Sequence, residues 1–245
     1  LENFIVRRTV CKVPPNSLSK IFGALIKDTK RRGFSKEVIT DFLSRNDYRS
    51  ESQFKQKFPS FDLYIKGNNT RAKVILECIE ASYGHKEQVL VNEQISIEHV
   101  LPQNPENAWW RNHLGEECDL IRETWLHTIG NLTLTGYNSE ESDKSYPDKR
   151  KYYENSNFEI TKELAKFEDW TEEIIQQRAD QLTARCVEKV WPNLNPNSES
   201  SKDEKAKGKS PCAFTILNKR CAVKGWAGVI HKTLETIAEL DPDLF

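Results

Sequence analysis

The chain has 245 residues, of which 30% are charged, and its formal net charge at pH 7 is −1. This length supports one large domain or two small ones. The sequence contains no run of about eighteen apolar residues and no basic-then-apolar N-terminal segment, which argues against a membrane span or a secretory signal. The absence of a basic excess argues against tight nonspecific DNA binding by the chain as a whole, but it leaves room for a local basic groove.

The first 88 residues are predicted to form a helical assembly that acts as a scaffold or places DNA. Apolar residues recur at helical spacing over 14–33, from Ser35 onward and over 69–83. Ser50 and Gln53 have the spacing of a capping box. Four cations crowd the last turn of the first helix, where they complement the helix C-terminus or, alternatively, contact a DNA backbone. They are Lys27, Lys30, Arg31 and Arg32.

A short strand is predicted from Ile95 to His99. Alternate residues of an extended chain share one face, so Ile97 lies on the side of His99 while Glu98 points the other way. Pro102 prevents this strand from continuing as a central ladder element. The strand therefore ends in a histidine.

A second strand and a short helix are predicted further along the chain. Leu132 and Leu134 alternate after Gly130, as in a strand. Asn138 and Ser139 are favoured helix N-cap types, and the polar run that follows them to residue 151 predicts a short exposed helix.

The segments around these strands are predicted to support them. Residues 106–126 look helical with an interruption at Gly115, and their three tryptophans (Trp109, Trp110 and Trp125) are expected to pack rather than to stack on bases. Helices are predicted over 161–167 and 169–190. The apolar stripe of the second helix should pack on the strands and brace them.

The C-terminal part of the chain divides into a linker and a small unit. Residues 193–210 are rich in Asn, Ser, Lys, Glu and Pro, which is typical of a flexible linker. Residues 213–217 are strand-like, and apolar residues then recur at helical spacing from Trp226 to Ile237. This strand–helix unit is too short to be stable unless it docks on another surface.

Two residue types add to the expectations. The six cysteines are scattered without a C-x-x-C pair, so no zinc knuckle is expected, and most should be reduced core residues of a cytosolic protein. The chain has no methionine, even at position 1, and is therefore expected to be a piece of a longer protein with an upstream domain.

Four pieces of sequence occur in an order that resembles a known family. They are IEHVLPQ, HTIGNLTLTGYN, SYPDK and DWTEEIIQQRADQLTARCVEKVWP. Together they resemble the C-terminal domain of GmrSD-type modification-dependent restriction endonucleases, an HNH-like (His-Me finger, ββα-metal) nuclease domain. The resemblance covers about residues 90–192, and the N-terminal ENFIVRRTVC is similar to the helical lead-in of that family.

The resemblance assigns chemical roles to the strand ends. His99 would be the general base, because a neutral imidazole accepts a proton near pH 7. Glu98 and Asn138 would offer oxygen ligands to Mg²⁺ or Mn²⁺, which are hard cations. For Glu98 a salt bridge with a neighbouring cation is the alternative, and for Asn138 the alternative is a plain helix N-cap.

Further roles follow from the same resemblance. Asn131 would brace the loop that carries His99, with a structural turn role beside Gly130 as the alternative. Lys149 or Lys144 would meet the phosphate and offset charge in the transition state, although exposed lysines are usually only solvated. Arg150 and Lys151 are expected to contact nucleic acid. His127 opens the HTIGN segment and would act on the site indirectly.

The predicted fold is mainly α (α+β), with a ββα-metal finger embedded among helices. The predicted divisions are a helical region at 1–88, the HNH-like nuclease domain at 89–192, the linker at 193–210 and the C-terminal unit at 211–245. The predicted function is metal-dependent cleavage of double-stranded DNA in a restriction or anti-phage defence system of the prokaryotic cytoplasm.

Modified phage DNA is one expected substrate, and the resemblance implies an upstream NTPase-like sensor domain on the same or a partner chain. The alternative is a catalytically degenerate module that binds nucleic acid or a partner protein without cleaving. RNA as the substrate stays open as well, because a finger contacts mainly backbone phosphates.

Overall fold

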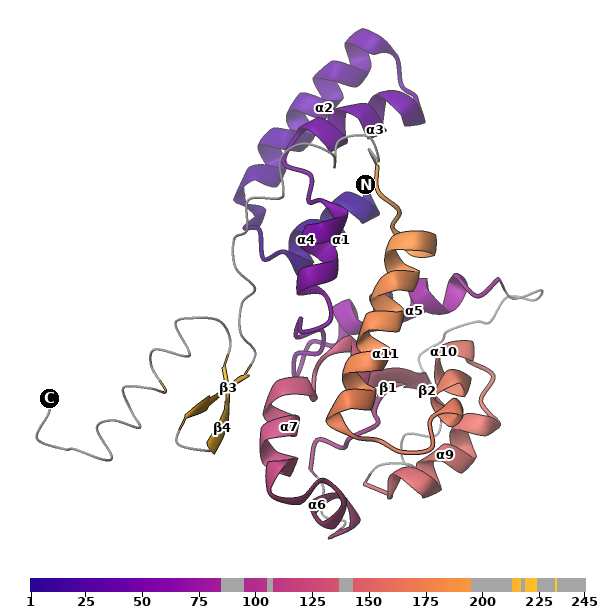
Figure 1. Ribbon diagram of the computed structural model, residues 1–245. Coiled ribbons are helices and arrows are strands. Elements are labelled where there is room, and N and C mark those ends of the chain that lie inside the picture. The colour runs from indigo at the N-terminus through magenta and orange to yellow at the C-terminus, as the bar shows by residue number, and fades with distance from the viewer. Residues whose placement is uncertain are drawn as a thin grey trace, which may run out of the picture.

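The computed structural model describes residues 1–84, 95–104, 108–136, 143–194, 213–216, 219–223 and 232 (Figure 1). The described chain is mostly helical and contains two separate two-stranded antiparallel sheets. The predicted mainly-α (α+β) class is therefore confirmed. Within these residues no helix is both long enough and apolar enough to cross a membrane.

The N-terminal region consists of short helices whose ends follow the predicted signals. Its elements are α1 (Glu2–Val10), the 3₁₀ turn η1 (Pro15–Ser17), α2 (Leu18–Arg32), α3 (Lys36–Arg45), α4 (Glu51–Lys57) and α5 (Thr70–Ala81). The hydroxyl of Ser35 accepts a hydrogen bond from the Val38 N–H, and Ser50 forms the predicted capping box with Gln53. The α2–α3 pair lies at one end of the molecule, away from the sheet of β1 and β2 (Figure 1).

The two predicted motif strands pair with each other. Strand β1 (Ser96–His99) runs antiparallel to β2 (Leu132–Thr135), and the register places His99 opposite Leu132. The elements between them are α6 (Ala108–Leu114), η2 (Gly115–Glu117), α7 (Cys118–Trp125) and η3 (Ile129–Asn131). The predicted interruption falls at Gly115, whose φ of 63° lies in the left-handed region that favours glycine.

The helix after β2 differs from the expectation. The described helix is α9 (Tyr146–Glu154), and its N-cap is Ser145, whose hydroxyl accepts from the Asp148 N–H. Asn138, which was expected near the start of this helix, lies outside the described residues. The helix is also not simply exposed, because one face buries Tyr146, Lys149 and Tyr153.

The remaining elements cover the sheet and end the described chain. They are α10 (Glu159–Lys162), η4 (Glu163–Lys166), α11 (Glu172–Arg185), the π-helical turn η5 (Cys186–Val190), β3 (Ala213–Ile216) and β4 (Lys219–Ala222). Strand β3 falls where a strand was predicted, and β4 lies against α7. The predicted linker and C-terminal helix fall almost wholly outside the described residues.

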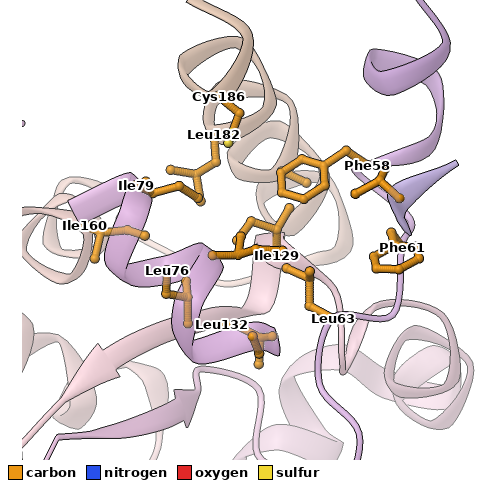
Figure 2. Packing of buried hydrophobic residues seen from close by; sticks show 14 of the residues in the cluster. Phe58, Phe61, Leu63, Leu76, Ile79, Ile129, Leu132, Ile160, Leu182 and Cys186 are labelled. Carbon is orange, nitrogen blue, oxygen red and sulfur yellow. The ribbon is translucent and has the colours of Figure 1, made fainter. Parts of the chain in front are cut away.

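One hydrophobic core joins the N-terminal helices to the motif strands. Figure 2 shows side chains from the loop after α4 and from α5, η3, β2, α10, α11 and η5 packed together, among them Phe58, Leu63, Leu76, Ile79, Ile129, Leu132, Ile160, Leu182 and Cys186. The predicted division between residues 88 and 89 falls among residues 85–94, which lie outside the described residues. The core contains residues from both sides of this division. The bracing role predicted for the long C-terminal helix is confirmed, because the apolar face of α11 lies in this core.

A buried arginine fastens α11 to the second motif. Arg178 donates hydrogen bonds to the backbone carbonyls of Ile129 (3.1 Å), Gly130 (2.8 Å) and Leu132 (2.9 Å). It also donates to the carbonyl of Ile160 at 3.3 Å. Burial lowers the pKa of Arg178 to about 10, so the group remains charged at neutral pH. Cationic hydrogen bonds to several carbonyls fix the start of β2.

Replacing Gly130 by alanine is expected to destabilise the protein by about 1–3 kcal/mol, because overpacking forces neighbouring groups to move. A Cβ at Gly130 would lie 2.3 Å from the carbonyl oxygen of Ile175, which belongs to a helix backbone. Urea unfolding of the variant measures the loss. Gly136→Ala is the matched control, since its nearest neighbour would be the Ile95 methyl group at 3.8 Å. Equal midpoints for the two variants would contradict the prediction.

Candidate active site

His99 ends β1 and faces two polar side chains. Its Nε2 lies 3.2 Å from Nδ1 of His127, and its Nδ1 lies 3.4 Å from the Nε2 amide of Gln103. The ring of Tyr64 meets the His99 ring edge-on with 4.7 Å between ring centres. His99 is 4% exposed, so the imidazole is held among polar and aromatic groups rather than in bulk water.

A cleft of about 630 Å³ opens beside this ring. The polar residues that line it, in addition to Glu98 and His99, are Tyr64, Asn69, Ser96, Gln103, Asn104 and Asp143. The volume lies within the range of ordinary ligand sites, about 300–1,000 Å³. The end of β1 is therefore reachable by a group that enters the cleft.

Asn131 holds the chain that follows His99. Its side-chain oxygen accepts from the Leu101 N–H at 2.7 Å, and its amide donates to the Leu101 carbonyl at 3.0 Å. The same amide donates to the Leu126 carbonyl, and the oxygen also accepts from the Trp170 indole. Asn131 is fully buried, so it acts on the loop after His99 by bracing it and does not face the cleft.

Glu98 and Lys149 form a buried ion pair, which was the alternative considered for Glu98. The Lys149 ammonium contacts the Glu98 carboxylate and donates at 2.9 Å to the carbonyl of His99. Glu98 is 2% exposed and Lys149 is fully buried. Lys149 is therefore buried and is not among the residues that line the cleft. Its contact with phosphate stays a prediction, and that contact would require the ion pair with Glu98 to open.

The other predicted cationic residues differ in their surroundings. Lys144 donates to the Tyr152 hydroxyl at 2.5 Å, and its ammonium lies over the Tyr152 ring. Arg150 donates to the Ala165 carbonyl at 2.9 Å. Lys151 is exposed and pairs with a neighbouring aspartate on α9. Their contact with nucleic acid stays a prediction, for which Lys151 is the most accessible.

The electrostatic surroundings keep the His99 ring neutral. Burial, followed by the nearby His127 and Lys149, lowers the pKa of His99 to about 3. At neutral pH the ring therefore has a lone pair with which to accept a proton. A phosphodiester anion in the cleft would favour the protonated form and so raise this pKa.

The residues near His99 include oxygen donors of the kind that a hard divalent ion prefers. Glu98 and Asp143 are among the residues that line the cleft, and the carboxylate of Glu98 is paired with Lys149. Magnesium typically takes one or two carboxylates and keeps several waters. Among the described residues no group of three or more His, Cys, Asp or Glu side chains is arranged for a metal, and Asn138 lies outside them. Glu98 is the predicted ligand that the structure describes.

Sequence reasoning missed part of this site. Tyr64 comes from the N-terminal region in which no chemistry was expected, and Asp143 had no assigned role. The backbone N–H groups of Leu63 and Tyr64 donate to the carbonyl of His127 at 2.8 and 3.3 Å. These hydrogen bonds place the Tyr64 ring beside His99. No local pattern marks such a long-range pairing, so the sequence offered no signal for it.

The family whose sequence model matches the chain is the C-terminal domain of GmrSD restriction endonucleases, and the match covers residues 48–185. This defines the class of the protein as a restriction-endonuclease-type nuclease module. The chain belongs to the family of GmrSD C-terminal domains. No curated protein matches it.

Proposed function

We propose that the chain is a metal-dependent endonuclease that hydrolyses phosphodiester bonds of DNA with an HNH-type finger built from β1, β2 and the helical segment after them. Membership of the GmrSD family supports the nuclease activity. The single observation that carries the assignment of the site is an imidazole at a strand end beside a cleft, with the loop after it braced by a buried asparagine.

His99 is the general base in this proposal. A water in the cleft loses its proton to the imidazole as it attacks phosphorus, a role that requires an unprotonated ring within hydrogen-bond reach of the water. Asn131 keeps the loop after His99 in place, and Lys149 holds the His99 carbonyl. These contacts hold the backbone at and after His99 in place, which lowers the entropic cost of reaching the transition state.

Glu98 and Asn138 are the proposed ligands of Mg²⁺ or Mn²⁺. When bound, the ion would supply positive charge where the leaving oxygen develops negative charge. Glu98 would be shared with, or released by, the Lys149 ammonium. Lys144, Arg150 and Lys151 are proposed to contact DNA phosphates from α9 and the segment that precedes it.

The biological setting is proposed from the family alone. A restriction role implies invading DNA as substrate, with modified phage DNA as one form and an NTPase-like sensor domain as a partner. The prokaryotic cytoplasm is the proposed location. Parallel digestion of matched DNA and RNA duplexes would decide between the two nucleic acids.

Metal removal is expected to abolish cleavage. Protein treated with EDTA should leave supercoiled plasmid and modified phage DNA intact, and added Mg²⁺ or Mn²⁺ should restore nicking, because the leaving oxygen then regains its stabilising charge. Agarose gels of timed digests measure the rate. Cleavage that continues at full rate in EDTA would contradict the metal requirement.

Calorimetric titration distinguishes the alternative of a degenerate binding module. Metal-dependent heat with the wild type that is weakened in Asn138→Ala would support the proposed ligand. Absence of such heat in both proteins, together with absence of cleavage, would show that the module binds without cutting.

A further inference from the structure

We propose that His127 is a positioning residue that sets the tautomer of His99: it accepts a hydrogen bond from the Nε2–H of His99 and leaves Nδ1 as the basic nitrogen. This inference rests on the proposed role of His99 as general base. It gives His127, which was expected to act on the site indirectly, a defined role, and it specifies which ring nitrogen of His99 does the chemistry.

The contact between the two rings requires one shared proton. Nε2 of His99 and Nδ1 of His127 lie 3.2 Å apart, a distance at which one nitrogen donates and the other accepts. The other ring nitrogen of His99, Nδ1, faces the amide nitrogen of Gln103 at 3.4 Å. An amide nitrogen only donates, so Nδ1 of His99 is the acceptor there, and with His127 neutral we place the ring proton of His99 on Nε2.

The placement of Gln103 also leaves the basic nitrogen available. The 3.4 Å contact is long for a hydrogen bond, so a water can replace it at little cost. Gln103 lies on the wall of the cleft, and its backbone carbonyl accepts a hydrogen bond from Arg122 of α7. Because His99 and Gln103 both line the cleft, we infer that a water in the cleft can reach Nδ1 of His99.

His127 is itself held firmly. Its backbone carbonyl accepts hydrogen bonds from both Leu63 and Tyr64, and the Tyr64 ring stacks on its imidazole with 5.3 Å between ring centres at 26°. The next residue, Thr128, is fully buried and bonds back to the Trp125 carbonyl at 2.9 Å. Because both its ring and its backbone are held in place, His127 is suited to orient the ring of His99.

Other groups near His99 do not orient its ring in this way. Lys149 bonds to the carbonyl of His99, and Asn131 bonds to the backbone two residues later. In the part of the chain that the structure describes, the polar contacts of the imidazole itself are with His127 and Gln103. Of these two, the contact with His127 is the shorter.

The proton balance of the step shows what His127 contributes. A water gives its proton to Nδ1 of His99, its oxygen forms a bond to phosphorus, and the opposite P–O bond breaks; the leaving oxygen takes a proton from solvent. His99 is then an imidazolium, and the Nε2–H bond to His127 becomes a stronger charge-assisted bond. His127 neither gains nor loses a proton, and it acts as the residue that orients a catalytic base.

The tautomer can be measured without substrate. In protein with ¹⁵N-labelled histidine, kept metal-free in EDTA, the two-bond ¹⁵N–¹H spectrum at neutral pH should show His99 protonated on Nε2, and His127→Leu should make the ring a mixture of tautomers. The His99→Ala spectrum assigns the signals. A wild-type His99 protonated on Nδ1, or a spectrum that His127→Leu leaves unchanged, would overturn the inference.

Cleavage kinetics test the consequence. His127→Leu is expected to lower the single-turnover rate about 10–100-fold, the size typical of residues that orient a functional side chain, while the DNA concentration for half-maximal rate stays the same. His127→Asn should recover most of the rate because its amide oxygen occupies the place of Nδ1. His127→Gln should not, because its amide reaches the place of Nε2.

The outcomes separate this inference from the proposed function. Equal rates for the Asn, Gln and Leu variants, or a loss confined to DNA affinity, would overturn the role of His127. Circular dichroism must show that each variant is folded. If a variant is not folded, its rate is set aside and the tautomer of His99 in the wild-type spectrum decides whether the inference holds. A wild-type protein that does not cleave in Mg²⁺ would instead end the proposed nuclease mechanism, and the spectrum would still test the contact between the rings.

Discussion

Replacing His99 by alanine is expected to reduce Mg²⁺-dependent DNA nicking about 10²–10⁴-fold, which is the usual contribution of a positioned general base. The variant lacks the ring that takes the proton from water, while Asn131 still braces the loop after it through backbone contacts. The single-turnover nicking rate of supercoiled plasmid measures the loss. Circular dichroism and gel filtration should match the wild type.

His113→Ala is the matched control for the His99 variant. His113 also lies among aromatic and acidic groups, since it stacks on Trp109 and pairs with Asp169 at 2.7 Å, but it does not line the cleft. It should therefore retain the wild-type rate. Undiminished cleavage by His99→Ala, or an equal loss in both variants, would refute the assignment of His99 as the base.

Replacing Lys149 by methionine is expected to destabilise the protein by about 3–5 kcal/mol, because removal of one partner leaves a buried charge uncompensated. The Glu98 carboxylate would lose its ammonium, and the His99 carbonyl would lose its donor. Urea unfolding followed by tryptophan fluorescence measures the change. Lys151→Met is the control, since this exposed lysine on the same helix should leave the urea midpoint unchanged.

The double variant Glu98→Gln/Lys149→Met measures the interaction between the two side chains apart from the contribution of each one alone. Removing the carboxylate charge as well should restore much of the lost stability, because no unpaired ion remains in the interior. A double variant as unstable as the sum of the two single variants would show that the pair is not coupled. A wild-type midpoint for Lys149→Met would show that the ion pair contributes nothing to folding.

Local signals in the sequence predicted much of the fold. The capping residues Ser35 and Ser50 and the break at Gly115 act within a few residues, so their patterns are visible in the chain itself. The start of α9 was predicted less well, because Asn138 and Ser145 are both good N-cap types and propensity alone does not choose between them.

Long-range pairing sets the limit on what the sequence predicted about the site. The motif gave Asn131 as a brace for the loop of His99, and the structure describes that contact directly. The partner of Glu98 stayed open between a metal and a cation, because Lys149 is 51 residues away. Tyr64 was not predicted at all, since its place beside His99 depends on how a distant loop pairs with His127.

The backbone bonds from Leu63 and Tyr64 to His127 also bear on how this nuclease can be transplanted. A unit cut from the chain at residue 89 would lack the lining residues Tyr64 and Asn69 and the aromatic side chains of α4 and the loop after it that share a core with β2. We therefore expect a unit that keeps the cleft intact to begin ahead of Phe54, close to where the family match begins at residue 48. Grafting the strand pair alone would carry His99 without Tyr64 and His127, whose rings lie against it.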